Sequence, residues 1–213
     1  TEKKEGEKIQ LTKTDSDKSE GLMIAEKIKE NYPDKKYSDH LILYRMNSQS
    51  RSIEEGLRRF NINYKVFGLS FYKRKEIKDI LAYLKLIVNK QDEESLIRII
   101  NFPARGIGKT SIEKIRDYWF DKNIPIWKVL KKINDIQINI NEGTKKKISN
   151  FCELIEGHSS NQFKSAFELT NLLIENLNLI NLLNKENTIE SLSKIENIKE
   201  LLNAIKLFSD EQE

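Results

Sequence analysis

The sequence predicts two fold classes in succession, an α/β part up to about residue 88 and an all-helical part from residue 89 onward. Up to residue 88, apolar runs of strand length alternate with amphipathic helical patterns, whereas from about Asp92 only helical periodicity remains. Strands that alternate with helices are typical of a parallel sheet covered by helices. We therefore expect a partial parallel sheet with helices, followed by a helical subdomain.

The first part contains three strand-like segments, and a helical pattern follows each of them. The strand-like segments are residues 9–11, 40–44 and 63–67, and the helical patterns cover residues 20–30, 52–60 and 75–88. The run from Leu41 to Tyr44 is continuously apolar, which is typical of a strand buried on both faces. This segment is the strongest single indication of a buried parallel sheet.

The second part reads as a series of helices separated by breaks rich in Pro, Gly and Asn. The stretch 172–183, rich in Asn, Ile and Leu, reads as a buried helix. The expected helices cover residues 93–100, 111–120, 126–132, 144–155, 165–176 and 189–209.

Composition excludes several classes of protein. The 37 basic and 33 acidic residues leave a net charge of only +4, so any argument for nucleic-acid binding must rest on local placement. Cys152 is the single cysteine and cannot form an internal disulfide, and no Cys/His cluster has the spacing of metal ligands. The apolar runs fall far short of the roughly 20 residues that a membrane helix needs. We expect a cytoplasmic protein with a buried thiol, no bound metal and no membrane partner.

The tripeptide Gly108-Lys109-Thr110 resembles the end of a phosphate-binding P-loop. The first glycine of such a loop would stand at position 103, which is Pro103, and the residues before it form a helical pattern in place of a strand. We therefore reject nucleotide binding at this segment.

A helix-hairpin-helix explains the same residues better. Gly106 and Gly108 permit unusual backbone angles, Ile107 would fill the core, and unpaired N–H groups at the start of the second helix would face outward. These groups and the helix dipole would bind a DNA phosphate without reading sequence, so that binding weakens steeply with salt. The alternative is a tight glycine turn that caps an ordinary helix. The candidate duplex-binding residues are Arg105, Gly106, Ile107, Gly108, Lys109, Thr110 and Ser111.

Three segments in order resemble the superfamily 1 DNA helicases of the UvrD/PcrA/Rep type. Residues 43–51 match the LYR-x-N-x-QSR stretch of that family, residues 71–79 match FY-x-R-x-EIKD, and residues 99–108 match IN-x-P-x-RGIG. A weaker fourth match lies at residues 195–201, so the similarity covers essentially the whole chain. One departure is the single Gly68, where family members usually carry paired glycines.

The resemblance implies a domain organisation and a second DNA contact. Residues 1–88 would be part of the second RecA-like motor domain, and residues 89–213 most of its helical accessory subdomain with the Gly-Ile-Gly hairpin. Arg45 and Asn47 would contact single-stranded DNA. The alternative for this pair is an arginine that caps carbonyl groups at a strand end and an asparagine in a turn.

The resemblance also implies the function of a longer bacterial protein, of which both ends of this chain look like internal cuts. That protein would be an ATP-dependent 3′ to 5′ DNA helicase that translocates on single-stranded DNA and unwinds duplex DNA in repair or replication, with ATP and Mg²⁺ as cofactors. This segment would supply contacts to the single strand and to the single-strand/duplex junction, but no catalytic residue, metal ligand or cofactor, and alone it would be inactive. Two alternatives remain open, a non-catalytic hairpin DNA-binding module and a helical scaffold.

Overall fold

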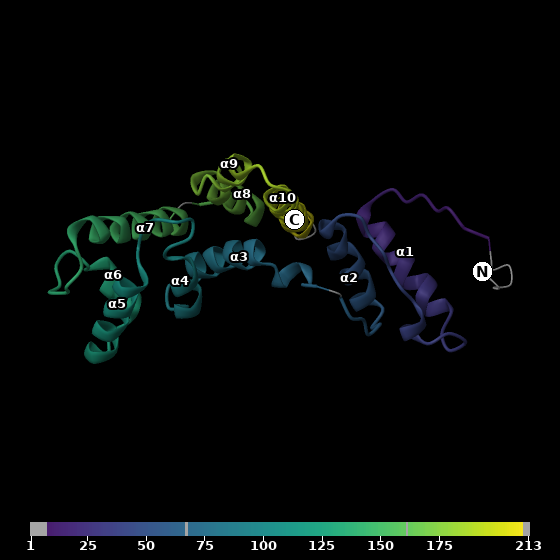
Figure 1. The fold of residues 1–213 in the computed structure, drawn as a ribbon, viewed down its shortest axis with the longest axis horizontal. Helices are drawn as coiled ribbons and strands as arrows, with labels where there is room; N and C mark the ends of the chain where they lie inside the picture. The colour runs from purple at the N-terminus through teal and green to yellow at the C-terminus, as the bar shows by residue number, and fades with distance from the viewer. Residues whose placement is uncertain (1–7, 67, 161, 211–213) are drawn as a thin grey trace. The chain divides into compact units, whose positions relative to one another are not determined.

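The computed structural model describes residues 8–66, 68–160 and 162–210, and the chain divides into two compact units, Thr1–Phe71 and Tyr72–Glu213 (Figure 1). Helices make up the regular structure of both units wherever the chain is described. No helix in the described ranges is long and apolar enough to cross a membrane.

The first unit is built on a pair of helices, α1 (Asp17–Glu30) and α2 (Ser50–Arg59), with short 3₁₀ helices η1 (Tyr37–Asp39) and η2 (Asn47–Gln49) between them. The Ser16 side chain caps α1 by accepting the N–H of Ser19. Both helices were predicted from periodicity, and the structure confirms them with slightly longer bounds. Their apolar faces enclose a small core of Ala25, Ile28, Ile53, Leu57 and Ile62.

Two glycines allow the backbones of α1 and α2 to touch. A Cβ atom on Gly56 would lie 2.2 Å from the carbonyl oxygen of Gly21, and one on Gly21 would lie 2.1 Å from the carbonyl oxygen of Ser52. Backbone atoms cannot yield as the end of a flexible side chain can, so this helix crossing requires glycine at both positions.

The parallel sheet that we expected in the first part is wrong. None of the residues in the described ranges forms a β-strand, and segments 9–11, 40–44 and 62–66 run without helical or strand structure. Phe67, the last residue of the third expected strand, lies outside the described residues.

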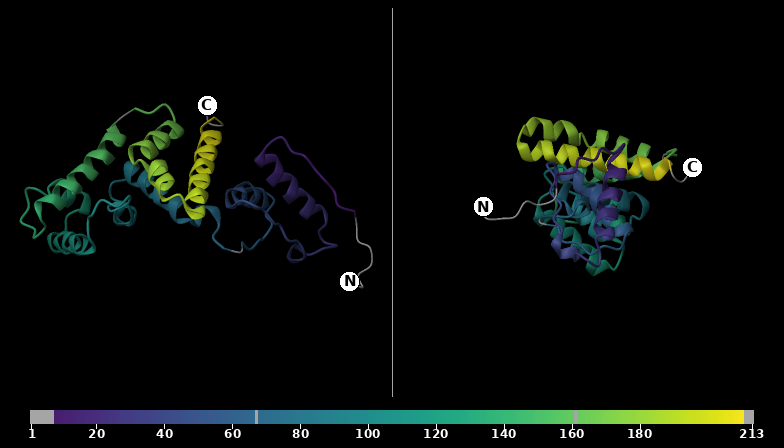
Figure 2. Two further views of the ribbon diagram at one scale, coloured as in Figure 1. Left: turned by 45° about the horizontal axis from the view of Figure 1, so that its top comes forward. Right: turned by 90° about the vertical axis from the view of Figure 1, so that its right-hand side faces the viewer.

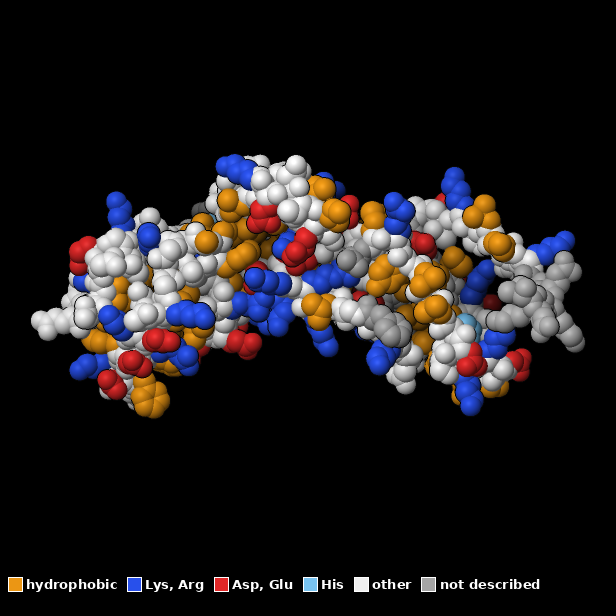
Figure 3. All heavy atoms as spheres, in the orientation of Figure 1, with side chains coloured by type: hydrophobic (Ala, Val, Ile, Leu, Met, Phe, Trp, Pro, Cys, Tyr) orange, Lys and Arg blue, Asp and Glu red, His pale blue; other side chains and the backbone are white. Residues whose placement is uncertain are grey.

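The physical reason is that only one face of segment 40–44 is covered by the helices. Ile42 and Tyr44 pack against the α1/α2 core, whereas Leu41 and Leu43 are 72% and 83% exposed. Segments 40–44 and 62–66 line a hollow of about 760 Å³ and do not pair with each other. Figure 3 shows hydrophobic side chains at the surface of this unit. The continuous apolar run therefore reflects packing beneath two helices, not burial within a hydrogen-bonded sheet.

The second unit is a helical assembly around α3 (Lys75–Val88), which has the bounds that its periodicity predicted. The short 3₁₀ helix η3 (Phe71–Lys73) precedes it. The remaining helices are α4 (Glu93–Ile99), α5 (Lys109–Lys122), α6 (Ile126–Lys131), α7 (Glu142–Ser160), α8 (Ala166–Asn176), α9 (Leu179–Glu186) and α10 (Ile189–Asp210).

The six helices expected after residue 89 are confirmed, but the expected buried helix 172–183 is interrupted. Asn178 adopts a left-handed conformation with φ of 54°, which ends the path of α8 and begins α9 at Leu179. Asparagine tolerates this conformation better than most residues. Helices α8, α9 and α10 consequently pack side by side (Figures 1 and 2).

Aromatic residues form the centre of the second unit where α3, α6 and α7 meet. Tyr83 of α3 and Trp127 of α6 each lie edge-on to the ring of Phe151 in α7, with ring centroids 6.5 and 6.4 Å apart. Next to this core, Cys152 is buried as expected, and burial raises the pKa of its thiol to about 12. This thiol is therefore a packing residue without thiolate chemistry at neutral pH.

A polar bridge joins α10 to the start of α3. Arg74 donates to Oδ1 of Asn197 at 2.7 Å, and Nδ2 of Asn197 donates to Oε1 of Glu76 at 2.6 Å. Arg74 and Asn197 are almost fully buried. Two of the segments that carry the family resemblance, residues 71–79 and 195–201, thus meet at one structural contact.

Candidate nucleic-acid interface

The predicted hairpin lies between α4 and α5. Asp92 caps α4 through a 2.9 Å hydrogen bond from the N–H of Ser95, and this bond lowers the pKa of its carboxyl group. In the loop that follows, Ile107 is completely buried, as expected of a residue that fills the core. Gly106 has φ of +72°, a conformation that side chains disfavour, whereas Gly108 has φ of −73° and precedes the first turn of α5.

The side chain of Asn101 organises the hairpin loop. Its Oδ1 accepts hydrogen bonds from the main-chain N–H groups of Arg105 and Ile107, each at 3.0 Å. These two N–H groups are therefore bonded internally. Our expectation of unpaired amides does not apply to them.

Four other N–H groups fit the expectation. Within the described part of the chain, the N–H groups of Gly106, Gly108, Lys109 and Thr110 have no hydrogen-bond acceptor, and all four residues are exposed. Ser111 differs, because its N–H is accepted by the carbonyl oxygen of Gly108 at 3.0 Å. Positive partial charge gathers at the start of a helix, and α5 is 14 residues long. The hairpin thus presents a short row of donors suited to an anion.

The guanidinium of Arg105 is half-buried and bonds to groups within the second unit. Nη2 donates to the hydroxyl of Tyr83 at 2.6 Å, and the guanidinium carbon lies 5.2 Å from the ring centre of Phe151. Nη1 faces the carbonyl oxygens of Ile99, Ile100, Phe102 and Pro103. We expected this side chain to reach a phosphate, but its donors are turned toward the end of α4, and a positioning role fits better.

Tyr83 completes this internal network. Burial raises the pKa of its hydroxyl to about 12, so the group stays protonated at neutral pH and donates to the carbonyl oxygen of Phe102. The hydroxyl also accepts from Arg105. The Arg105 guanidinium and the Tyr83 hydroxyl together hold the hairpin loop against α3 and α7.

Lysines stand beside the outward donors. Lys109 is exposed at the first position of α5. Lys147 of α7 reaches over the loop, since a Cβ atom built on Gly106 would lie 2.8 Å from its Nζ. Lys114 is already engaged with the carbonyl oxygen of Asn139 at 2.8 Å. Lys109 and Lys147 therefore add positive charge beside the outward donors.

The second candidate contact lies in the first unit, at the loop before α2. Arg45 is exposed, and within the described residues its guanidinium has no partner. Its N–H and that of Met46 both donate to Oε1 of Gln49, at 3.2 and 2.9 Å. Asn47 opens η2, but its side chain lies outside what the structure describes.

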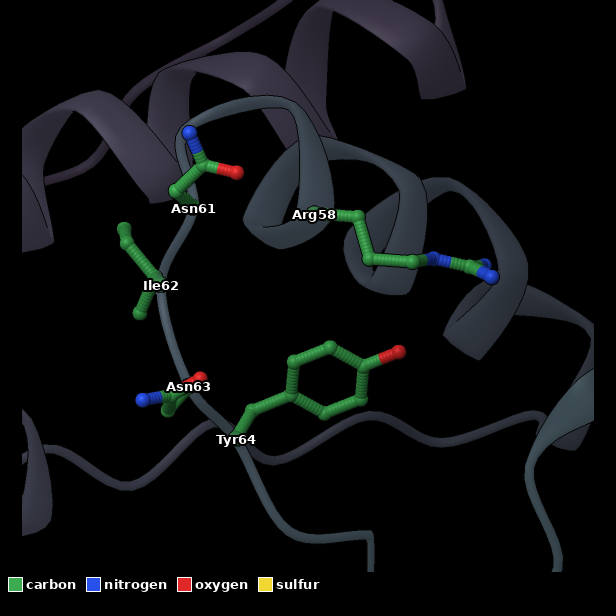
Figure 4. Close-up of a pocket in the computed structure, with 5 residues that line it drawn as sticks. All are labelled: Arg58, Asn61, Ile62, Asn63 and Tyr64. Atoms are coloured by element: carbon green, nitrogen blue, oxygen red, sulfur yellow. The ribbon is translucent and has the colours of Figure 1, made fainter.

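An open hollow of about 280 Å³ lies under the end of α2, and its lining residues are Arg58, Asn61, Ile62, Asn63 and Tyr64 (Figure 4). The Tyr64 hydroxyl donates to Glu54 at 3.1 Å, and the Nε of Arg58 donates to the carbonyl oxygen of Glu54 at 3.2 Å. Both polar groups are used within the unit, so we assign no ligand to this hollow.

Sequence reasoning missed Asn101, Tyr83 and the precise task of Gln49. Asparagine is known to accept hydrogen bonds from nearby main-chain N–H groups, and Asn101 stands four residues before Arg105, so its type and position gave a usable signal. The sequence contains no such signal for Tyr83, because a tyrosine on the buried face of a helix is indistinguishable from an ordinary core residue.

The sequence model of the UvrD-like helicase C-terminal domain matches residues 1–213, the whole chain. This chain belongs to that family.

Members of the UvrD-like family with high similarity include proteins described as ATP-dependent DNA helicase PcrA. The protein of Bacillus subtilis (strain 168) is 38% identical over 217 residues, which cover 100% of this chain and 29% of that protein. The protein of Staphylococcus aureus (strain Mu50) is 38% identical and that of Staphylococcus epidermidis (strain ATCC 35984) 37% identical, each over 96% of this chain and 28% of the relative. The chain thus spans 28–29% of the length of these curated relatives.

Proposed function

We propose that this chain is a part of an ATP-dependent DNA helicase that supplies DNA contacts and not ATP hydrolysis, and that the hairpin before α5 grips the backbone of duplex DNA. The full-length protein would use ATP and Mg²⁺ to move 3′ to 5′ on a single strand and to unwind duplex DNA in bacterial repair or replication. Membership of the UvrD-like family and the names of the PcrA relatives support this role. The cellular location that fits it is the cytoplasm.

One observation carries the proposal for the hairpin. The outward N–H groups of Gly106, Gly108, Lys109 and Thr110 lie at the positive end of α5. Such groups bind phosphate oxygens irrespective of base sequence, and Lys109 and the hydroxyls of Thr110 and Ser111 can add to them. The buried Ile107 and the internally bonded Arg105 would hold the loop in place and not touch the DNA.

The proposal includes a division of labour along the chain. Residues up to about 88 would belong to the motor part of the helicase, and residues 89–213 to a helical accessory subdomain that reaches the single-strand/duplex junction. The first part would contact the single strand through Arg45, whose guanidinium is exposed, and through Asn47. Arginine suits this task, because it can pair with a phosphate or stack on a base.

The duplex contact predicts a selective effect of Gly106→Ala. Alanine disfavours a left-handed φ by roughly 1–2 kcal/mol, so the loop would shift and misplace its donors. We expect affinity for a tailed duplex to fall about 5- to 30-fold at low salt, measured by fluorescence anisotropy on the full-length protein.

Gly157→Ala is the control, because it makes the same change within α7, where a Cβ atom meets nothing within 4 Å. If Gly106→Ala binds the duplex as tightly as the unaltered protein at low salt, the hairpin does not grip DNA.

The single-strand contact predicts that Arg45→Ala in the full-length protein lowers affinity for an oligonucleotide about tenfold, as expected for the loss of one charged or stacking contact. DNA-stimulated ATP hydrolysis should need a correspondingly higher DNA concentration for half-maximal rate. Arg59→Ala is a control on the exposed last turn of α2. An unchanged DNA dependence of the ATPase in Arg45→Ala would remove Arg45 from the interface.

A further inference from the structure

The loop of the duplex-binding hairpin is held by an uncharged side chain. We propose that Asn101 is the positioning residue of this site, and that its neutral carboxamide fixes the loop without adding negative charge that would repel a DNA phosphate. This inference rests on the proposed function of the hairpin.

The hydrogen bonds of Asn101 sort the amides of the loop into two sets. Oδ1 accepts the N–H groups of Arg105 and Ile107, each at 3.0 Å, while those of Gly106 and Gly108, both exposed residues, have no acceptor among the described residues. Inward and outward donors therefore alternate from residue 105 to residue 108. The acceptor at Asn101 determines which N–H groups remain for a ligand.

A carboxylate could make the same two bonds. In this chain, Asp92 accepts the N–H of Ser95 at 2.9 Å, and Glu54 accepts the N–H of Phe71 at 3.1 Å. Charge-assisted bonds of this kind are stronger than neutral ones. For loop geometry alone, aspartate at position 101 would thus serve at least as well as asparagine.

The difference between the two side chains lies in charge. Asn101 is exposed, so a carboxylate there would stand in solvent next to the outward amides of Gly106 and Gly108. Like charges a few ångströms apart repel appreciably even in water. A phosphate would then meet a negative charge at the place where it should be bound.

The same arrangement occurs at the candidate single-strand contact. Oε1 of Gln49 accepts the N–H groups of Arg45 and Met46 at 3.2 and 2.9 Å. In both loops that we propose to contact DNA, the oxygen of one neutral side-chain amide therefore accepts two main-chain N–H groups.

The test compares stability with DNA binding in Asn101→Asp, using the full-length protein. We expect the urea midpoint of unfolding to stay the same or rise. Affinity for a tailed duplex should fall about tenfold at low salt, and the slope of log K against log salt should decrease in magnitude by about 1. Asn203→Asp, with the same charge change on the exposed side of α10, should bind within about twofold of the unaltered protein.

Two further variants, Asn101→Ala and Lys109→Ala, distinguish the effect of charge from loss of the acceptor and from failure of the hairpin to bind DNA. Asn101→Ala removes the acceptor without adding charge, and should lower both stability and duplex affinity while leaving the salt slope nearly unchanged. If Asn101→Asp keeps full affinity, or loses as much stability as Asn101→Ala, the inference is wrong. Lys109→Ala shows whether the proposed function itself is wrong. If the hairpin does not bind duplex DNA, Lys109→Ala and Asn101→Asp both leave affinity unchanged. If the hairpin binds but Asn101 has no such role, only Lys109→Ala lowers affinity.

Discussion

Arg105→Ala is expected to lower the free energy of unfolding of the second unit by about 1.5–3 kcal/mol, the usual contribution of hydrogen bonds from a charged group. The guanidinium bonds to the Tyr83 hydroxyl at 2.6 Å and faces carbonyl oxygens at the end of α4. Without it, those carbonyl groups lose a charged donor, and a gap opens beside the ring of Phe151. Urea unfolding of the full-length protein, followed by circular dichroism, measures the loss.

Two variants make the Arg105 result specific. Arg116→Ala removes an exposed arginine from α5 and should change stability by less than about 0.5 kcal/mol. Arg105→Lys keeps the charge but not the planar set of donors, so its loss of stability should lie between those of Arg105→Ala and Arg116→Ala. A loss of less than about 1 kcal/mol in Arg105→Ala would mean that Arg105 does not anchor the hairpin.

Gly56→Ala is expected to destabilise the first unit by about 3 kcal/mol, at the upper end of the usual cost of overpacking. The added methyl group would lie 2.2 Å from the carbonyl oxygen of Gly21, so α1 and α2 would have to separate. Their separation would open the core around Ile53 and Leu57. Thermal unfolding and limited proteolysis of the first unit would report the change.

Gly157→Ala is the matched control for Gly56→Ala. Gly157 is also helical, within α7, but a Cβ atom there meets nothing within 4 Å. This change should raise stability by about 0.5–1 kcal/mol, because alanine favours helix more than glycine does. Equal effects of the two substitutions would contradict the close backbone contact between α1 and α2.

The helices could be predicted because their signals are local. Apolar spacing placed α3 at residues 75–88, as observed, and the acidic run from Asp92 marked the start of α4. The break at Asn178 was missed, since asparagine permits a left-handed turn but does not require one. Local signals thus locate helices better than they locate interruptions within apolar stretches.

The absence of the sheet could not be predicted, because a β-strand forms only where a second strand pairs with it, and the sequence of one segment does not show whether such a strand lies beside it. Leu41 to Tyr44 has the composition of a buried strand, yet only Ile42 and Tyr44 are packed against the core. An apolar run reports that burial is favourable, and not whether a sheet or a helix pair supplies it.

The candidate site was predictable in its backbone and not in its side chains. Glycine spacing indicated the turn at Gly106 and the buried position of Ile107. The direction of Arg105 could not be predicted, because a guanidinium suits carbonyl oxygens inside the fold as well as a phosphate outside it. Which amides Asn101 occupies likewise depends on the folded path of the loop.

Nuclear magnetic resonance follows individual main-chain amides of the isotope-labelled protein while a short tailed duplex is added, and so tests the hairpin contact itself. We expect the amide signals of Gly106, Gly108, Lys109 and Thr110 to shift in proportion to bound DNA and to return as salt is raised. The internally bonded amides of Arg105 and Ile107 should shift far less. If the four outward amides stay in place when the DNA is saturating, the hairpin is not a phosphate-binding element.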